Sequence, residues 1–211
     1  MAKTGAWSSG VLAGLGVLYM GLVAGSVVSG GGLMPGEPFQ TIIHVLVMLM
    51  AGWMVFLWAV LHRSTPDDRK AFSLASFGMV IALAALTCIN RYVALTVVRQ
   101  SLGARDVPGL QWFLPYTWPS VMLAIEILAW GFFLGLACLS LAPVFRTGPF
   151  ARGLFWALLA TGVLALCAAL GQIVGSVALS FAGLAGWGPG LTTVSVLMAL
   201  RFDRAGTRKA P

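Results

Sequence analysis

Long apolar runs separated by short polar segments follow one another along the whole chain. A helix needs about 20 apolar residues to cross a hydrocarbon core of about 30 Å. Glycine, proline and charged residues, which end helices, gather in the segments between the runs. We therefore expect an all-α fold, a polytopic membrane bundle forming a single integral membrane domain over residues 1–211. Six transmembrane helices are predicted, at residues 7–29, 40–62, 71–98, 117–144, 153–175 and 177–201.

The composition supports a membrane protein. Hydrophobic residues make up 59% of the chain and charged residues 9%, with a mean hydropathy of +0.94. Soluble domains carry about 25% charged residues. The net charge of +7 does not indicate a nucleic-acid partner, because the basic residues lie between or after the apolar runs and form no groove. Cys88, Cys138 and Cys167 lie inside apolar runs without metal-ligand spacing, so we expect no metal and no redox role.

The distribution of lysine and arginine predicts the orientation. With six spans, three basic residues (Arg91, Arg99 and Arg105) fall on or toward one side of the membrane. Cytoplasmic loops are enriched in basic residues, so both termini are expected in the cytoplasm of a multi-pass plasma-membrane protein. The first run exceeds the 7–15 or so residues of a signal-peptide core, and we expect an uncleaved helix. The ten basic residues on the cytoplasmic side are Lys3, Arg63, Arg69, Lys70, Arg146, Arg152, Arg201, Arg204, Arg208 and Lys209.

One carboxylate stands inside an apolar run. In SVMLAIEILAWGFFLG, residues 120–135, Glu126 is flanked by apolar residues only. If the fourth helix enters near Thr117, Glu126 lies nine residues deeper, which corresponds to about 13 to 14 Å. An ionised group near mid-membrane costs at least ~2.5 to 3.5 kcal/mol on insertion scales. We therefore expect Glu126 to be paired, protonated or exposed to a water-filled cavity.

Arg91 is the expected partner of Glu126. It lies about seven residues, or roughly 10 Å, from the outer end of the third helix near Val98. That depth is close to the depth of Glu126, and a loop of about 18 residues between the two helices favours their being neighbours. We predict an ion pair between Arg91 and Glu126. The other residues expected in this polar cluster are Asn90, Tyr92 and His44.

Two interpretations of this pair stay open. It locks two helices in register, since removing one partner of a buried pair costs ~3 to 5 kcal/mol. Alternatively, Arg91 and Glu126 line an outward-opening pocket, where Arg91 meets an anionic headgroup or carboxylate, or Glu126 carries a proton or cation. For His44 alone, a satisfied histidine near the membrane interface is the simpler interpretation.

The last span contains GLAGWGPG, residues 183–190. Two spans of about 20 residues between Gly153 and Arg201 place the turn near Gly175 and Ser176, so GWGPG falls inside the sixth helix. Proline removes a backbone donor and glycine loosens a helix. We predict a kink or break at the level of Glu126, as in the discontinuous helices of many transporters. A longer turn followed by a short, tilted last helix is the alternative. The residues of the predicted break are Gly186, Gly188, Pro189 and Gly190.

Several kinds of chemistry lack their residues. No lysine lies within a span, which excludes a retinal Schiff base. The only histidines are His44 and His62, the second at the cytoplasmic edge, so a bis-histidine haem within the bilayer lacks ligands. HExxH, GxSxG and GxxxxGK[ST] motifs are absent from the sequence. We expect no catalytic residues of these kinds and no cofactor.

A segment around the pair resembles a known set of proteins. RYVALTVVRQSL, followed by FLPYTWPSVMLAIEILAWGFFLGLACLSLAPVF, is similar to bacterial six-helix membrane proteins of uncharacterised activity. Those proteins carry a polar and aromatic helix end, an extracellular loop with a tyrosine, and an acid in the next helix. The resemblance covers about a quarter of the chain, implies a bacterial membrane protein and implies no activity. The family-like positions are Arg91, Tyr92, Tyr116 and Glu126, and an arginine at position 91 departs from the family pattern.

Three functions compete at this point. The first is a small non-enzymatic membrane protein that binds a lipid or small amphipathic molecule, or supports a larger membrane complex or a homo-oligomer. The second is a proton- or cation-coupled secondary transporter that uses Glu126, which requires a water-accessible cavity. The third is an intramembrane lipid-modifying enzyme, which requires His44 or Tyr92 within hydrogen-bond reach of Glu126. The lipid bilayer is the one partner common to all three.

Overall fold

The computed structural model describes residues 1–31, 36–103, 107–115 and 117–207. Six helices in this part of the chain are long and apolar enough to cross a membrane, as predicted. This finding indicates a multi-pass membrane protein. Four residues named in the sequence analysis lie outside the described residues: Arg105, Tyr116, Arg208 and Lys209. The bounds of the six spans are Ala2–Ser29, Phe39–Ser64, Asp67–Ser101, Val121–Val144, Ala151–Val174 and Val177–Thr207.

Changes in helical hydrogen bonding divide four of the spans into shorter segments. The first span contains α1 (Ala2–Ser26) and the beginning of η1 (Val27–Gly31), and the second is α2 (Phe39–Ser64). The third contains η2 (Asp67–Arg69), α3 (Lys70–Val93), η3 (Ala94–Val98) and α4 (Arg99–Ser101). After η4 (Leu110–Phe113), the fourth contains α5 (Val121–Ile127), η5 (Leu128–Phe133), α6 (Leu134–Leu141) and η6 (Ala142–Val144). The fifth is α7 (Ala151–Val174), and the sixth contains α8 (Val177–Ala185), η7 (Gly186–Gly190) and α9 (Leu191–Thr207).

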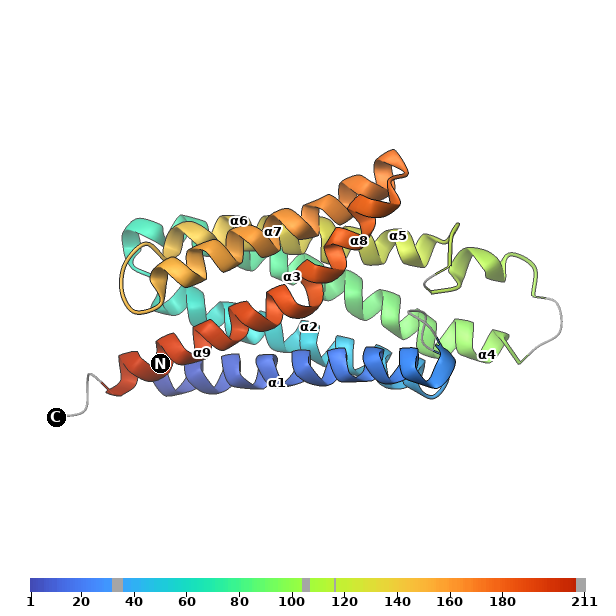
Figure 1. The fold of residues 1–211 in the computed structure, drawn as a ribbon, viewed down its shortest axis with the longest axis horizontal. Coiled ribbons are helices and arrows are strands. Elements are labelled where there is room, and N and C mark those ends of the chain that lie inside the picture. Colours follow the sequence, from blue (N-terminus) through green and yellow to red (C-terminus); the bar gives the residue numbers. More distant parts are fainter. Residues whose placement is uncertain (32–35, 104–106, 116, 208–211) are drawn as a thin grey trace.

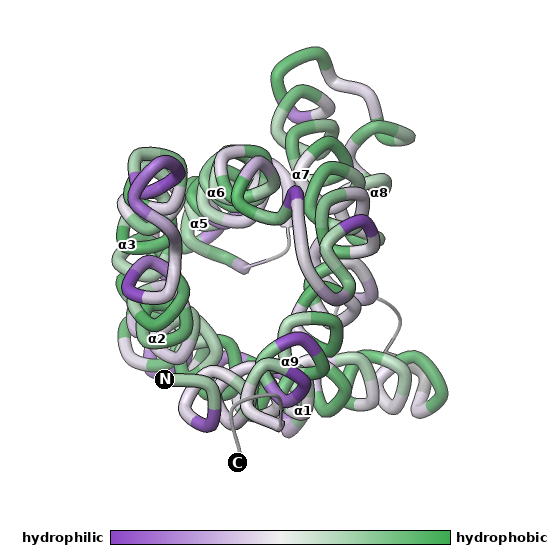
Figure 2. The backbone as a smooth tube through the Cα atoms, turned by 90° about the vertical axis from the view of Figure 1, so that its left-hand side faces the viewer, coloured by the Kyte–Doolittle hydropathy of each residue, from purple (hydrophilic) through white to green (hydrophobic). Residues whose placement is uncertain are grey.

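The spans form a ring in chain order. Each packs against the next, and α9 of the last span lies along α1 of the first, which closes the ring (Figure 2). The start of α1 and the last residues of α9 lie at one end of the bundle, called the terminal end below (Figure 1). The opposite end, where α4 and the turn between α7 and α8 lie, is the distal end. The inside of the ring is filled by buried side chains that include Leu12, Met54, Trp58, Leu134, Leu158 and Val194.

The turn between the last two spans lies where the sequence predicts it. The fifth span ends at Val174 and the sixth begins at Val177. Gly175 adopts a left-handed backbone (φ 71°), which a residue without a Cβ reaches at no steric cost. The predicted break at GWGPG has a different form. Residues Gly186–Gly190 make a π-helical turn with Pro189 inside it, and the helix continues on both sides. The sixth helix is therefore not interrupted at GWGPG, and GWGPG is not part of a long turn.

The fourth span begins later than predicted. Its first helical residue is Val121, because the Ser120 hydroxyl oxygen accepts hydrogen bonds from Met122 N (3.1 Å) and Leu123 N (3.4 Å) and caps the helix there. Glu126 is therefore five residues into its helix, about 8 Å, and lies nearer the helix start than the expected 13 to 14 Å.

Glycines allow the fourth and fifth spans to approach closely. A Cβ added at Gly135 would lie 3.0 Å from Gly162 O, and one added at Gly162 would lie 3.0 Å from Gly135 O. GFFLG, residues 131–135, is thus a true packing motif of the kind that small residues provide in membranes. GVLAG, residues 10–14 of the first span, behaves differently, because neither Gly10 nor Gly14 has a neighbour within 4 Å of such a Cβ. In GLVAG, residues 21–25, only Gly25 has one, the Phe39 ring at 3.3 Å.

Candidate functional site

Two consecutive residues of α3 form the centre of a buried polar cluster. Asn90 and Arg91 are 4% and 3% exposed, although α3 is otherwise apolar at this level. Arg91 Nη2 forms an ion pair with Glu126 Oε1 of α5. Asn90 Nδ2 donates to the other carboxylate oxygen, Oε2, at 3.0 Å. The structure therefore brings Arg91, Asn90 and Glu126 together, and both oxygens of the carboxylate are held from one helix.

His44 joins this cluster from α2. Arg91 Nη1 donates a hydrogen bond to His44 Nδ1 at 2.9 Å, because a guanidinium has no acceptor. His44 is 3% exposed and lies five residues after the start of α2. Three spans thus meet at Arg91, which contacts an imidazole with one nitrogen and a carboxylate with another.

A small cavity adjoins the ion pair inside the ring. We call it the interior cavity, and it has a volume of about 30 Å³, room for about two water molecules. Glu126 reaches it, since the Glu126 side chain remains 12% exposed. Five of the six spans contribute to its wall, which consists of Tyr19, Val47, Met50, Arg91, Glu126, Trp130 and Trp187.

Two indole groups of the interior cavity carry buried donors. In the described part of the chain, neither Trp130 Nε1 nor Trp187 Nε1 has a hydrogen-bond partner. A buried donor without an acceptor costs roughly 1 to 3 kcal/mol. Two such donors on residues that line one cavity therefore favour a bound group with acceptor atoms, either water or part of a ligand.

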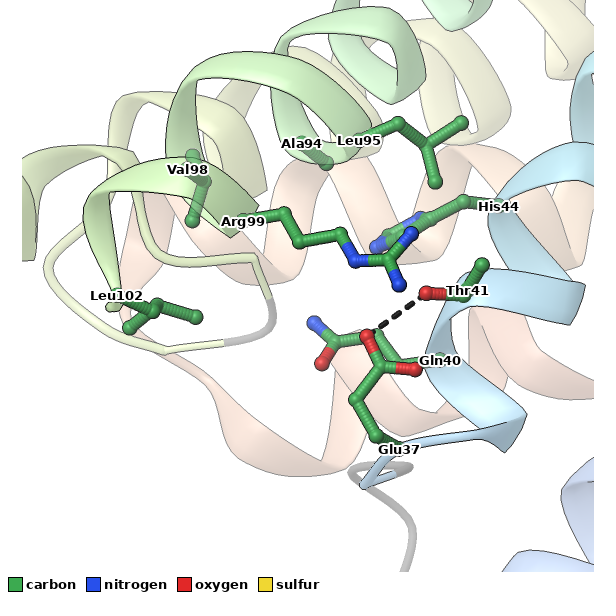
Figure 3. Close-up of a pocket in the computed structure, with 9 residues that line it drawn as sticks. All are labelled: Glu37, Gln40, Thr41, His44, Ala94, Leu95, Val98, Arg99 and Leu102. Atoms are coloured by element: carbon green, nitrogen blue, oxygen red, sulfur yellow. Dashed lines mark hydrogen bonds between the residues drawn. The ribbon is translucent and has the colours of Figure 1, made fainter.

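A second hollow lies at the distal end, between the start of α2 and the end of the third span. We call it the vestibule (Figure 3). The Arg99 side chain extends into it from α4, and the Glu37 carboxylate and Gln40 amide approach from the side of α2. His44 lines the vestibule and also contacts Arg91, so it lies between the two hollows. The remaining lining residues are Thr41, Ala94, Leu95, Val98 and Leu102.

Tyr92 lies outside the predicted cluster, whereas the sixth span reaches it. Tyr92 is 62% exposed, because it follows Arg91 by about 100° around the helix and so turns outward. The GWGPG segment does reach the cluster, through Trp187, while Gly186 and Gly190 pack against Thr161 of α7. Of the predicted site residues, Asn90 and Arg91 contact Glu126, and Arg91 also contacts His44, whereas Tyr92 is exposed outside this group.

Sequence reasoning missed Tyr19, Trp130 and the π-helical turns beside the site. Trp130 lies four residues after Glu126, a spacing that places both on one helix face, so it was visible in the sequence. The turns η3, η5 and η7 follow Arg91, follow Glu126 and contain Trp187, respectively. Such turns insert one residue into a helix and occur often at functional sites. Only η7 carries a glycine and proline signal that marks it in advance.

Comparison of the chain with protein-family models, with curated proteins and with solved structures gives no match. The geometry of the site offers one ion pair, one imidazole, two indole donors and a cavity of water size. Within the described residues, no cluster of histidine, cysteine and acidic side chains is arranged to hold a metal ion.

Proposed function

We propose that this chain is a non-enzymatic, multi-pass protein of a bacterial plasma membrane that binds a lipid or small amphipathic molecule at the interior cavity. In this proposal both termini lie in the cytoplasm, and the distal end faces outward. The distribution of basic residues and the resemblance around Arg91 and Glu126 support these points.

One observation carries the binding proposal: the indole N–H groups of Trp130 and Trp187 are buried without acceptors beside the fixed Arg91–Glu126 pair. The pair supplies equal and opposite charges, so the cavity as a whole favours a polar group over a free ion. With room for about two water molecules, the cavity accepts only a small polar end, such as a carbonyl or hydroxyl oxygen. The apolar remainder of the ligand would then lie between the helices.

Native mass spectrometry of the detergent-purified protein tests this proposal. We expect the wild type to carry a bound molecule and the double variant Trp130→Phe/Trp187→Phe to lose it, because phenylalanine keeps the ring but lacks the N–H donor. The matched control is Trp156→Phe, since Trp156 is 59% exposed outside the cavity. A wild type that carries no bound molecule, or a double variant that retains it, contradicts the proposal.

A second candidate, a proton- or cation-coupled carrier, is favoured by the contact between Glu126 and the interior cavity. A carrier of this kind needs an ionisable group that water can reach within the membrane. Proteoliposomes with an internal pH-sensitive dye distinguish the two functions. Proton flux in the wild type that disappears in Glu126→Gln supports the carrier, and equal flux in both proteins rejects it.

A further inference from the structure

The vestibule is lined by one acidic and one basic side chain, Glu37 and Arg99, at the distal end of the bundle. Glu37 precedes the first residue of α2 by two positions, and Arg99 begins α4 near the end of the third span. Both side chains are exposed on the distal side, where these two apolar helices start and finish. In a membrane-spanning bundle, the ends of the spans lie at the level of the lipid headgroups.

Glu37 and Arg99 are oriented toward the same hollow without joining each other. Thr41 Oγ1 donates a hydrogen bond to Glu37 Oε1 at 2.7 Å, which fixes the carboxylate against the first turn of α2 (Figure 3). The Arg99 guanidinium faces this carboxylate across the vestibule (Figure 3). No ion pair links the two groups in the residues that the structure describes. Arg99 and Glu37 can therefore bind a ligand that carries both a negative and a positive group.

Apart from Arg99, the side of the vestibule formed by the third span is apolar. Leu95, Val98 and Leu102 line it. The hollow itself measures about 20 Å³, so only a small group enters it, and the larger part of a ligand lies along the exposed surface. This combination of a charged pair and an apolar strip matches a headgroup attached to a hydrocarbon chain.

We infer that the vestibule binds a phospholipid headgroup that combines a phosphate with a primary ammonium. Arg99 takes the phosphate, because a guanidinium matches phosphate oxygens with two parallel hydrogen bonds. Glu37 takes the ammonium, whose N–H groups donate to a carboxylate. A quaternary ammonium has no N–H to donate, and a headgroup without an amine leaves Glu37 unpaired. The same charges occur in free phosphoethanolamine, so the lipid and soluble sources must be tested separately.

This site is distinct from the interior cavity and does not depend on its proposed function. His44 lines the vestibule and is hydrogen-bonded to Arg91, so a headgroup in the vestibule lies next to the buried cluster. Separate variants address the two hollows. Glu37→Gln and Arg99→Gln change only the vestibule, and Trp130→Phe/Trp187→Phe changes only the interior cavity.

Lipid titration followed by native mass spectrometry tests the inference, with phosphatidylethanolamine, phosphatidylcholine and phosphatidylglycerol of identical acyl chains as probes. We expect the wild type to prefer phosphatidylethanolamine by roughly tenfold, the effect of one charge-assisted hydrogen bond. Glu37→Gln should remove this preference, because Glu37 takes the ammonium, and Arg99→Gln should weaken the binding of all three lipids, because each carries the phosphate. The matched controls are Arg152→Gln and Asp203→Asn, exposed residues near the terminal end that should leave the preference and the binding unchanged.

Three outcomes overturn the inference: equal binding of the three lipids by the wild type, an unchanged preference in Glu37→Gln, or the same losses in the control variants. Competition by soluble phosphoethanolamine separates the sources, since displacement of the lipid at equal concentration shows that the headgroup alone suffices. A thermal-unfolding curve for each variant verifies folding, and exposed Glu37 and Arg99 are expected to tolerate the change. Retention of the lipid preference in Trp130→Phe/Trp187→Phe keeps the two proposals separate.

Discussion

The side-chain amide of Asn90 donates a hydrogen bond to Glu126 Oε2 at 3.0 Å. The same nitrogen donates to Met122 O at 3.1 Å, so Asn90 connects the carboxylate to the backbone one turn earlier in the same helix. Arg91, the next residue, holds the other carboxylate oxygen. The third and fourth spans are therefore joined by adjacent residues that serve different atoms of one acid.

We predict that Asn90→Ala lowers the stability of the bundle by roughly 1 to 3 kcal/mol, because Glu126 Oε2 and Met122 O both lose a donor. Thermal unfolding in detergent measures the effect. Tyr92→Phe is the control, since Tyr92 is exposed on the same helix and should change the unfolding temperature little. Equal unfolding temperatures for Asn90→Ala and the wild type would contradict the assignment.

Removing one member of the ion pair should cost more than removing both. Arg91→Ala leaves the Glu126 carboxylate without its counterion, and Glu126→Gln leaves the Arg91 guanidinium without its counterion. We expect each variant to lower the free energy of unfolding by about 3 to 5 kcal/mol. The double variant should recover part of this loss, and the difference gives the coupling energy of the pair. Thermal unfolding of all four proteins provides the cycle. Asp67→Asn, which breaks the exposed Lys70 pair, should have little effect.

Additive losses in that cycle would mean that Arg91 and Glu126 act independently. In that case Glu126 would be satisfied by Asn90 and by the interior cavity, and the carrier proposal would gain support. An unchanged unfolding temperature for Glu126→Gln alone leads to the same conclusion.

The contact between α6 and α7 should be sensitive to a single methyl group. Gly135→Ala and Gly162→Ala place a Cβ against backbone oxygen of the opposite helix, and we expect each to cost about 1 to 3 kcal/mol. Gly52→Ala and Gly78→Ala are the controls, because nothing lies within 4 Å of a Cβ at those positions. The control variants should be neutral or slightly stabilised, since alanine favours a helix more than glycine does. Unfolding temperatures in detergent test all four.

The proposed orientation predicts which turns a membrane-impermeant maleimide reaches. In a variant without native cysteines, Ser176→Cys between the last two spans should react in intact cells. Thr147→Cys, between the fourth and fifth spans, should react only after permeabilisation. The reverse labelling pattern would place both termini outside the cytoplasm.

The spans were predictable because the length of an apolar run reports directly on a membrane-crossing helix. The meeting of Arg91 with Glu126 was also predictable, since a charge in an apolar run needs a partner and few candidates exist. The start of the fourth span was placed too early at Thr117. In that region Ser120 follows Pro119, and the capping hydroxyl of Ser120 was the better sign of the helix start.

The position of Tyr92 and the π-helical turns were harder to infer. The sequence does not reveal how α3 is rotated about its axis, so residues 90 to 92 were all placed in the cluster. A helix turns about 100° per residue, which leaves one of the three outside. A π-helical turn changes that rotation by one inserted residue, so η5 decides where Trp130 points after Glu126. Apolar sequence alone carries little information about such an insertion.

The ring of spans in chain order has a consequence for synthesis of the protein. Tyr19 of the first span and Trp187 of the last line the same cavity, and α1 contacts α9 directly. A chain made from its N-terminus inserts Arg91 and Glu126 well before Trp187 emerges, so their pair forms in an open arc of helices. The wall of the cavity is therefore completed only when the last span docks, and until then the first span exposes to lipid the side against which α9 packs.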